Sequence, residues 1–306
     1  MMMKFAGINI SDDAVHYIEY SMGRGHPRIK RFAAATIPRG LVEGGDFKDE
    51  KALITLLSTF EKENNVSYVK VSVPEEKAYL FQTDVPAADV HTIGQNIEFK
   101  LDQNVPLSAA DAIFYFDLLP AVAGGPLRAS VSVVPRSYIE HYIEILRSAN
   151  MVPVAFEIVP KAIARAIVPQ EETDKAVMIV HIMDYKTGVY IVSGGVVCFT
   201  STVSWGSRLP ADGHNDISIL AKEMTRITAY WLSHGTVNAQ ISEVVLVGKD
   251  AAIYENTLRT GIAGTGLSVT MANVWRNIFD LDSYIPPISR ELSLDYAVAA
   301  GLAMEL

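Results

Sequence analysis

Hydrophobic and polar positions alternate at the start of the chain as they do in β-strands. Apolar residues of Phe5–Ile10 alternate with small ones, and Val15–Tyr20 alternates apolar with polar side chains. Between them, Ser11-Asp12-Asp13 has short polar side chains that hydrogen-bond their own backbone and favour a turn. A third strand is predicted at Ile29–Thr36, and the same hairpin pattern returns at Ala176–Phe199.

The segment that follows the first strands has the period of an amphipathic helix. Leu53, Leu56, Leu57 and Phe60 are spaced i, i+3, i+4, i+7, which predicts a helix over Asp46–Asn65. Further elements of the first half are expected at Tyr68–Val73 (strand), Lys77–Asp84 (strand), Val90–Leu101 (helix), Ala112–Leu119 (strand), Leu127–Val134 (strand), Arg136–Ala149 (helix), Met151–Ile158 and Lys161–Ile167.

In the second half the pattern predicts the same order of elements, β-β-β-α-β-α. Its elements are expected at Ala176–Ile182, Thr187–Val192, Val196–Val203, Glu243–Val247 and Leu267–Met271 (strands) and at Asp216–His234, Ala251–Arg259 and Leu292–Met304 (helices). A hairpin that opens each half is typical of the α/β actin/Hsp70-like ATPase fold, in which two lobes face each other across a cleft. We therefore predict a first lobe at 1–76 and 150–172, an inserted α+β module at 77–149, a linker at 169–174 and a second lobe at 173–306.

Composition narrows the function classes. The chain has 306 residues, 49% of them hydrophobic, and a net charge of −9. None of its Lys/Arg runs is longer than a pair, so nucleic acid is not an expected partner. The single Cys198 excludes an internal disulfide and is expected in the core. Because no apolar run approaches about 18 residues, we expect no direct membrane insertion; at a membrane, another protein would have to hold the chain.

Several stretches resemble the PilM family of type IV pilus assembly proteins, which are relatives of the cell-division protein FtsA. They are GINISDDAVHYIEY, VSVPEEKAYLFQTDVP, IEFKLDQNVPLSAADAIFYFDLL, SVVPRSYIEHYIEILRSANMVPVAFEIVPKAIARAI and LSLDYAVAAGLAMEL. The resemblance implies a cytoplasmic protein, peripheral to the inner membrane, that binds the N-terminal segment of a PilN-like membrane protein and connects it to the pilus assembly ATPases or platform proteins. It also implies ATP bound between the lobes and hydrolysed weakly or not at all.

The first phosphate loop departs from the family pattern, which resembles GIDIGSSSVK. The acid expected to support Mg²⁺ is replaced by Asn9, and the glycine expected to approach phosphate by Ser11. Asp12 and Asp13 stand where hydroxyl groups would contact phosphate, and their charge is expected to repel it. His16 stands at the family's lysine position.

The second phosphate loop and the adenosine loop depart as well. Of the pattern DIGxxxT only Thr187 is kept, because His181 replaces the acid and Met183 the glycine; Gly248 is the one glycine left of a Gly-Gly pair. We predict from these losses that Mg·ATP binds weakly or not at all. The sequence leaves open whether Lys186, Lys249 or Lys222 compensates for the lost nucleotide contacts.

Other motifs have simpler interpretations. The glycines of Gly261-x-x-Gly264-x-Gly266 are interpreted as a helix end and turn, and His181 with Asp184 as part of a polar turn rather than a metal site. Ser204, His214 and Asp216 lack a nucleophile-elbow motif. Phe114–Phe116 are expected in a strand with one face packed on a helix, and Trp205-Gly206-Ser207 is expected at the cleft wall.

The leading functional hypothesis is a structural adaptor, without enzymatic activity, that binds the partner's extended N-terminal segment near the groove beside the inserted module. The alternative is an ATP-binding switch whose nucleotide state controls partner binding in a pilus or type II-like secretion machine. A third hypothesis, a membrane-bound filament former similar to FtsA, lacks support because the chain shows no C-terminal amphipathic helix. Formation of a homo-oligomer stays open.

Overall fold

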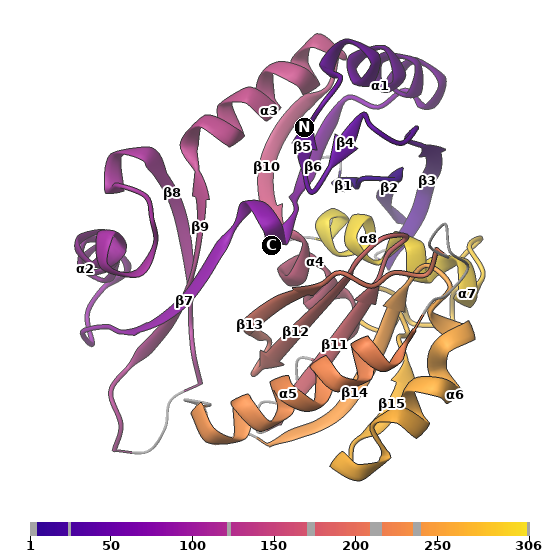
Figure 1. Ribbon diagram of the computed structural model, residues 1–306. Helices are drawn as coiled ribbons and strands as arrows, with labels where there is room; N and C mark the ends of the chain where they lie inside the picture. The colour runs from indigo at the N-terminus through magenta and orange to yellow at the C-terminus, as the bar shows by residue number, and fades with distance from the viewer. Residues whose placement is uncertain are drawn as a thin grey trace.

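Two five-stranded sheets and a smaller three-stranded sheet organise the computed structural model (Figure 1). The structure describes residues 5–23, 26–120, 124–169, 175–208, 216–234 and 240–304. The linker predicted at 169–174 therefore lies almost wholly outside the described residues.

The first sheet has the strand order β10-β6-β1-β2-β3. Strands β1, β2 and β3 form an antiparallel meander, and β6 and β10 add to it in parallel. Its strands are β1 (Phe5–Ile10), β2 (Ala14–Gly23), β3 (His26–Thr36), β6 (Tyr68–Val73) and β10 (Val152–Ile158).

The second sheet repeats this plan in the order β13-β12-β11-β14-β15. Again three antiparallel strands are followed by two parallel ones. Its strands are β11 (Ala176–Ile182), β12 (Thr187–Ser193), β13 (Val196–Val203), β14 (Ile241–Gly248) and β15 (Ser268–Met271). The repeated order confirms the α/β actin-like fold with a duplicated core.

The third sheet, β7-β9-β8, stands beside the two larger ones at the left of Figure 1. It is built from β7 (Tyr79–Asp84), β8 (Ala112–Leu118) and β9 (Arg128–Pro135), and helix α2 (Val90–Asn104) covers one face. Ile93, Ile97 and Leu101 of α2 are buried in one cluster with Val131 and Val133 of β9. This unit is the inserted module.

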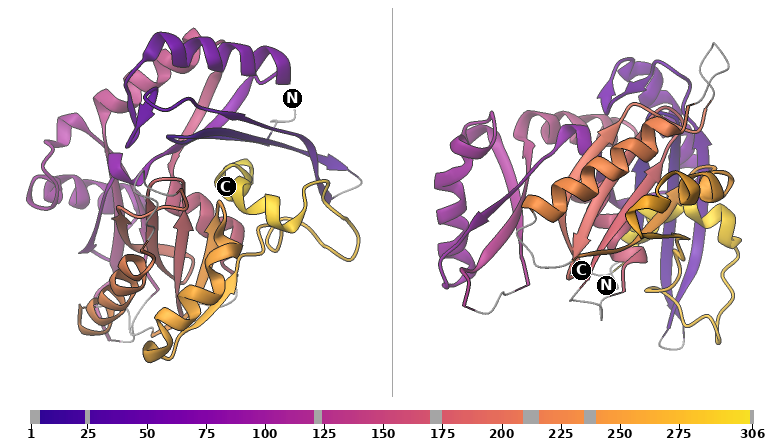
Figure 2. Two further views of the ribbon diagram at one scale, coloured as in Figure 1. Left: turned by 45° about the vertical axis from the view of Figure 1, so that its right-hand side comes forward. Right: turned by 60° about the horizontal axis from the view of Figure 1, so that its bottom comes forward.

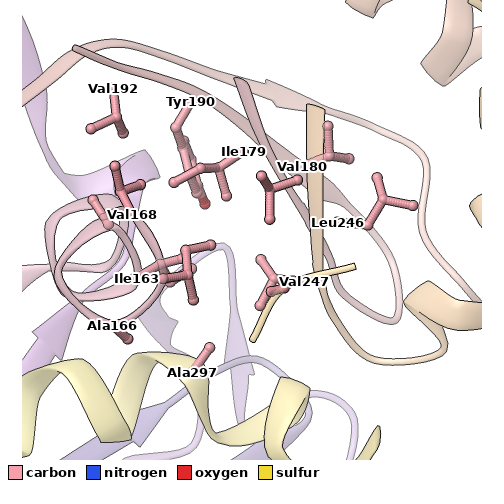
Figure 3. Close-up of a cluster of buried hydrophobic side chains, with 14 of the residues drawn as sticks. Ile163, Ala166, Val168, Ile179, Val180, Tyr190, Val192, Leu246, Val247 and Ala297 are labelled. Carbon is pink, nitrogen blue, oxygen red and sulfur yellow. The ribbon is translucent and has the colours of Figure 1, made fainter. Parts of the chain in front are cut away.

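Helices cover both faces of the large sheets. On the first sheet's outer face lie α1 (Glu50–Asn64) and α3 (Arg136–Ser148), and on the second sheet's lie α5 (Ser218–His234) and α6 (Ala251–Gly261). Between the sheets lie α4 (Val159–Ile167) and α8 (Ala297–Ala303), as Figure 2 shows for α8. Figure 3 shows Ile163 of α4, Ile179 of β11 and Val247 of β14 in one buried cluster.

Two predicted helices are corrected by the structure. Helix α1 begins at Glu50 rather than near Asp46, because Gly44 and Gly45, both with positive φ, close a small hairpin of β4 (Val42–Glu43) and β5 (Asp46–Phe47). The single helix predicted at Leu292–Met304 is divided into α7 (Arg290–Ser293), a 3₁₀ turn (Leu294–Tyr296) and α8.

The residue boundaries proposed for the lobes stay a prediction. Strand β10 joins the first sheet, but α4, which was expected to return to the first lobe, shares its buried cluster with the second sheet. Within the described ranges, no helix is both long enough and apolar enough to span a membrane.

Candidate functional site

A cleft of about 340 Å³ lies between the two large sheets, where the first hairpin of each sheet turns. Its walls include five of the predicted nucleotide residues: Asn9, Ser11, Asp12, Asp13 and Gly248. It is also lined by His16, Arg39, Glu75, His181, Met183, Asp184, Tyr185, Lys186, Arg208, Lys249 and Asp295. The topology therefore brings both predicted loops to one site.

The first loop is a turn closed by its own hydrogen bonds. The Ser11 N–H donates to the Ala14 carbonyl (2.9 Å), and the Ser11 hydroxyl donates to Asp13 Oδ1 (2.8 Å). Asn9, which is buried, accepts a hydrogen bond from the Ser72 hydroxyl (2.8 Å). Both polar side chains predicted to face a ligand are thus satisfied within the protein.

Asp12 has partners that the sequence did not reveal. Its carboxylate accepts hydrogen bonds from the N–H groups of Gly44 (3.0 Å) and Gly45 (3.2 Å) in the β4–β5 turn. Its Oδ2 also lies 3.1 Å from Lys186 Nζ. Asp12 therefore stabilises a turn and an ion pair, and its charge is largely neutralised.

The structure corrects the expectation for Thr187. Its side chain is fully buried, and its hydroxyl donates to the Trp205 carbonyl (2.8 Å), outside the cleft. Gly248 does line the cleft, with φ of 95°, but a Cβ there would lie 2.2 Å from the Ile182 carbonyl oxygen. Close packing of β14 on β11 is enough to require this glycine.

Of the lysines considered for compensation, Lys186 and Lys249 line the cleft, whereas Lys222 lies away from it between α5 and α6. Lys249 Nζ lies 2.9 Å from Asp184 Oδ1, and Arg208 approaches the other oxygen of Asp184 at 3.4 Å. Burial raises the pKa of the nearby Asp13. Lys186, Lys249 and Arg208 are thus each paired with carboxylates at the cleft.

Burial also sets the protonation of the histidines. It lowers the pKa of His16 to about 4 and that of His181 to about 3, and a nearby lysine contributes to each shift. Both imidazoles are neutral near pH 7 and cannot act as phosphate-binding cations. Because the folded state disfavours the imidazolium form, each histidine reduces stability as the pH falls below about 6.5.

Glu75, Glu76 and Arg39 are cleft-side residues that sequence reasoning missed. Glu75 is buried and accepts a hydrogen bond from the Tyr190 hydroxyl (2.8 Å), while Glu76 pairs with Lys186. A signal was present, because these acids directly follow β6, and carboxyl ends of neighbouring parallel strands meet at one edge of a sheet.

The interpretations of the glycine motif, of the aromatic strand and of Cys198 are confirmed. Helix α6 ends at Gly261, and Gly266 follows a 3₁₀ turn with φ of 73°. In the described part of the chain no group of acids, histidines and cysteine could hold a metal ion. Phe114 and Phe116 pack on the α2 side of their sheet, and Cys198 is buried, which raises its thiol pKa to about 12. His214 lies outside the described residues.

Comparison with known proteins decides the family. A sequence model of the type IV pilus assembly protein PilM family matches residues 7–212. The chain belongs to the PilM family. No protein with a curated description matches the sequence.

Solved structures support the fold assignment of this PilM-family protein. A chain from the "PilM-PilN type IV pilus biogenesis complex" superimposes with a TM-score of 0.78 at 18% identity, covering 97% of both chains. The ethanolamine utilization protein EutJ from Carboxydothermus hydrogenoformans gives a TM-score of 0.52 at 12% identity, covering 99% of this chain and 90% of its own.

The cleft of this PilM-family protein gives a testable pH dependence through Glu75. Burial raises the pKa of Glu75 to about 7, and the charge of Glu76 adds to the shift. Since the folded state holds this proton more tightly than the unfolded state, Glu75 lowers the free energy of unfolding as the pH rises from about 4.5 to 7.

Glu75→Gln keeps the size and an acceptor for Tyr190 but carries no charge. We expect its melting temperature to exceed that of the wild type at pH 8 by about 2–4 °C, the shift that ~1 kcal/mol gives in a chain of this size, and the difference to vanish near pH 5. Differential scanning calorimetry at both pH values would measure it, with Glu63→Gln on the exposed face of α1 as the control. An equal or lower melting temperature at pH 8 would contradict the prediction.

Proposed function

We propose that this protein is an adaptor of a type IV pilus assembly complex. In this proposal it works at the cytoplasmic face of the inner membrane and binds the N-terminal segment of a PilN-like membrane protein. The observation that carries the proposal is the family match over residues 7–212, together with structural similarity along 97% of the chain to a protein solved in a PilM–PilN complex.

One edge of the inserted module, strand β8, has the properties of a peptide-binding edge. Strand β8 pairs only with β9 among the described strands, and its pairing runs without a bulge. Its Ile113 and Tyr115 are exposed, Tyr115 at 59%. An unpaired, regular and apolar edge is suited to receive an extended segment by strand addition.

Strand β10 supplies a second exposed apolar position. It too is an edge strand, but Pro153 and an irregularity between Pro153 and Ala155 interrupt its pairing. Such an edge is protected against strand addition. Val154, exposed at 58%, is therefore proposed as a side-chain contact, and β8 as the strand that is extended.

Helix α4 connects this surface to the core of the protein. Lys161 Nζ lies 3.8 Å above the centre of the Tyr115 ring and 2.8 Å from Asp117 Oδ2. Because these contacts fix β8 against α4, the edge is held in place before the partner arrives. Preorganisation of this kind reduces the entropy lost on binding.

Charge substitutions on this surface test its role. Ile113→Glu and Val154→Glu are each expected to weaken binding of a synthetic PilN-like N-terminal peptide at least tenfold, because a carboxylate replaces an apolar contact, a change of at least ~1.4 kcal/mol. Fluorescence anisotropy would measure binding, and thermal melting would verify the fold. The matched control is Ile253→Glu, at an exposed apolar position of α6. Unchanged affinity in both variants would refute this placement.

We further propose that adaptor function requires neither Mg·ATP nor enzymatic activity. Supporting this are the hydrogen bonds of Asn9, the turn contacts of Asp12 and the ion pair of Lys249, which occupy the groups that a nucleotide would need. The alternative, an ATP-dependent switch, is favoured by the cleft itself, which keeps about 340 Å³ and is lined by Arg39, whose guanidinium carbon lies 5.2 Å from the centre of the Tyr185 ring. We propose as well that the adaptor contacts pilus ATPases or platform proteins, and that it forms homo-oligomers.

A further inference from the structure

The turn between β11 and β12 contacts acidic residues on the opposite side of the cleft. Lys186, at the end of this turn, pairs with Asp12 after β1 and with Glu76 after β6. The Lys186 side chain is only 15% exposed. One ammonium group thus joins two carboxylates from separate segments of the first sheet to the second sheet.

A hydrogen bond crosses the cleft beside this ion pair. Tyr190 of β12 donates to Glu75 at 2.8 Å, and both side chains are buried. Gly188 makes room for this contact, because a Cβ there would lie 2.0 Å from the Tyr190 hydroxyl oxygen and 2.8 Å from Glu75 Oε1. Residues 188 and 190 lie on the same face of β12, since side chains alternate along a strand.

A third contact lies at the mouth of the cleft. The Arg39 guanidinium carbon, from the segment after β3, lies 5.2 Å from the centre of the Tyr185 ring. Tyr185 precedes Lys186 in the same turn. The β11–β12 hairpin is therefore held from the first lobe by two ion pairs, a hydrogen bond and a cation–π contact.

We propose that Lys186 is a tethered internal cation that holds the two lobes closed without any ligand. Asp12, Glu75, Glu76, Lys186 and Tyr190 form what we name the interlobe latch. Asp12 and Glu76 both lie on the first lobe and would repel each other without a cation between them, and the ammonium group of Lys186 from the second lobe supplies that charge. Because this cation is covalently attached to the second lobe, closure needs no bound metal or nucleotide.

Lys249 provides a natural contrast within the same cleft. Its ion-pair partner Asp184 belongs to the same sheet as Lys249, so this pair joins two segments of one lobe. Neutralising Lys249 removes a cleft cation without removing a contact of the latch. Comparing the Lys186 and Lys249 variants therefore tests whether a cation must join the two lobes, and not only whether a cation is present in the cleft.

The experiment measures the distance between the lobes by pulsed electron paramagnetic resonance. Spin labels are attached at Lys51→Cys on α1 and Thr257→Cys on α6, both exposed, in a Cys198→Ala background. Without nucleotide, we expect the parent protein to give one narrow distance distribution. Lys186→Met is expected to shift and broaden the distribution toward longer distances by several ångströms, whereas Lys249→Met leaves it unchanged.

A second variant keeps the test decisive if Lys186→Met does not fold. Glu76→Gln removes the ion pair of Lys186 with Glu76 but leaves intact the pair of Lys186 with Asp12 and the bonds of Asp12 to the β4–β5 turn. It is expected to broaden the distribution in the same direction. Circular dichroism verifies the fold of each variant, and an unchanged distribution in a folded Lys186→Met or Glu76→Gln protein would overturn the proposal. Peptide binding is measured in a separate experiment. If the proposed adaptor function failed that test, the distance measurement on the interlobe latch would still stand.

Discussion

Gly301→Ala is expected to destabilise the protein by about 3 kcal/mol, because overpacking against rigid backbone is costly. Gly301 lies in α8, where a Cβ would lie 1.8 Å from the carbonyl oxygen of Ala162 in α4. The two helices cross at this point between the large sheets, and Arg165 donates to the Gly301 carbonyl at 2.9 Å. Neither backbone can move without separating the cores that both helices share.

Thermal unfolding would measure this loss as a fall in melting temperature of about 6–12 °C, at 2–4 °C for each kcal/mol. Gly94→Ala in α2 is the matched control, because a Cβ there meets nothing within 4 Å. That substitution should raise stability by about 0.5–1 kcal/mol, since alanine favours the helix. Equal melting temperatures for the two variants would contradict the prediction, because α4 and α8 would then accommodate the added methyl group without loss of stability.

Alternation and helical spacing were sufficient to predict most of the strands and helices. The hairpins at Phe5–Tyr20 and Ala176–Phe199 form as expected, because short polar or glycine turns separate strongly alternating segments. The β-α-β-β-α module also forms as expected. The local sequence pattern gave wrong helix bounds at two places. At Gly44-Gly45 a two-residue turn precedes the helix, and at Leu294–Tyr296 tertiary packing interrupts a helical pattern.

The candidate site was predicted only as a set of neighbouring loops. Resemblance located Asn9, Ser11, Asp12, Asp13 and Gly248, which do meet at the cleft. It could not show that Asp12 binds Lys186, because the two residues lie in different halves of the chain and their contact depends on how the lobes meet. Thr187 was matched by motif alone, and the motif could not show that its hydroxyl bonds to the Trp205 carbonyl within the same lobe instead of facing the cleft.

The largest functional effect is expected in a titration with ATP and Mg²⁺. Each lost residue that supports a metal costs about 10–100-fold in affinity. By the family resemblance, Asn9 and His181 stand where two such residues are expected, so a micromolar starting affinity would weaken to a Kd of about 0.1–10 mM. Binding would also require the nucleotide to displace Asp184 from Lys249 or to open the contacts of Lys186.

Isothermal titration calorimetry up to millimolar ATP with Mg²⁺ should therefore give no saturable heat near micromolar concentrations. Circular dichroism on the same sample would verify that the protein is folded. Saturable binding with a micromolar Kd would contradict the prediction and favour the ATP-dependent switch. In that case Lys249→Met and Lys222→Met form an informative pair, because only Lys249 lines the cleft. Loss of binding in Lys249→Met alone would show that this lysine compensates for the substituted phosphate loops, and the adaptor would then depend on nucleotide.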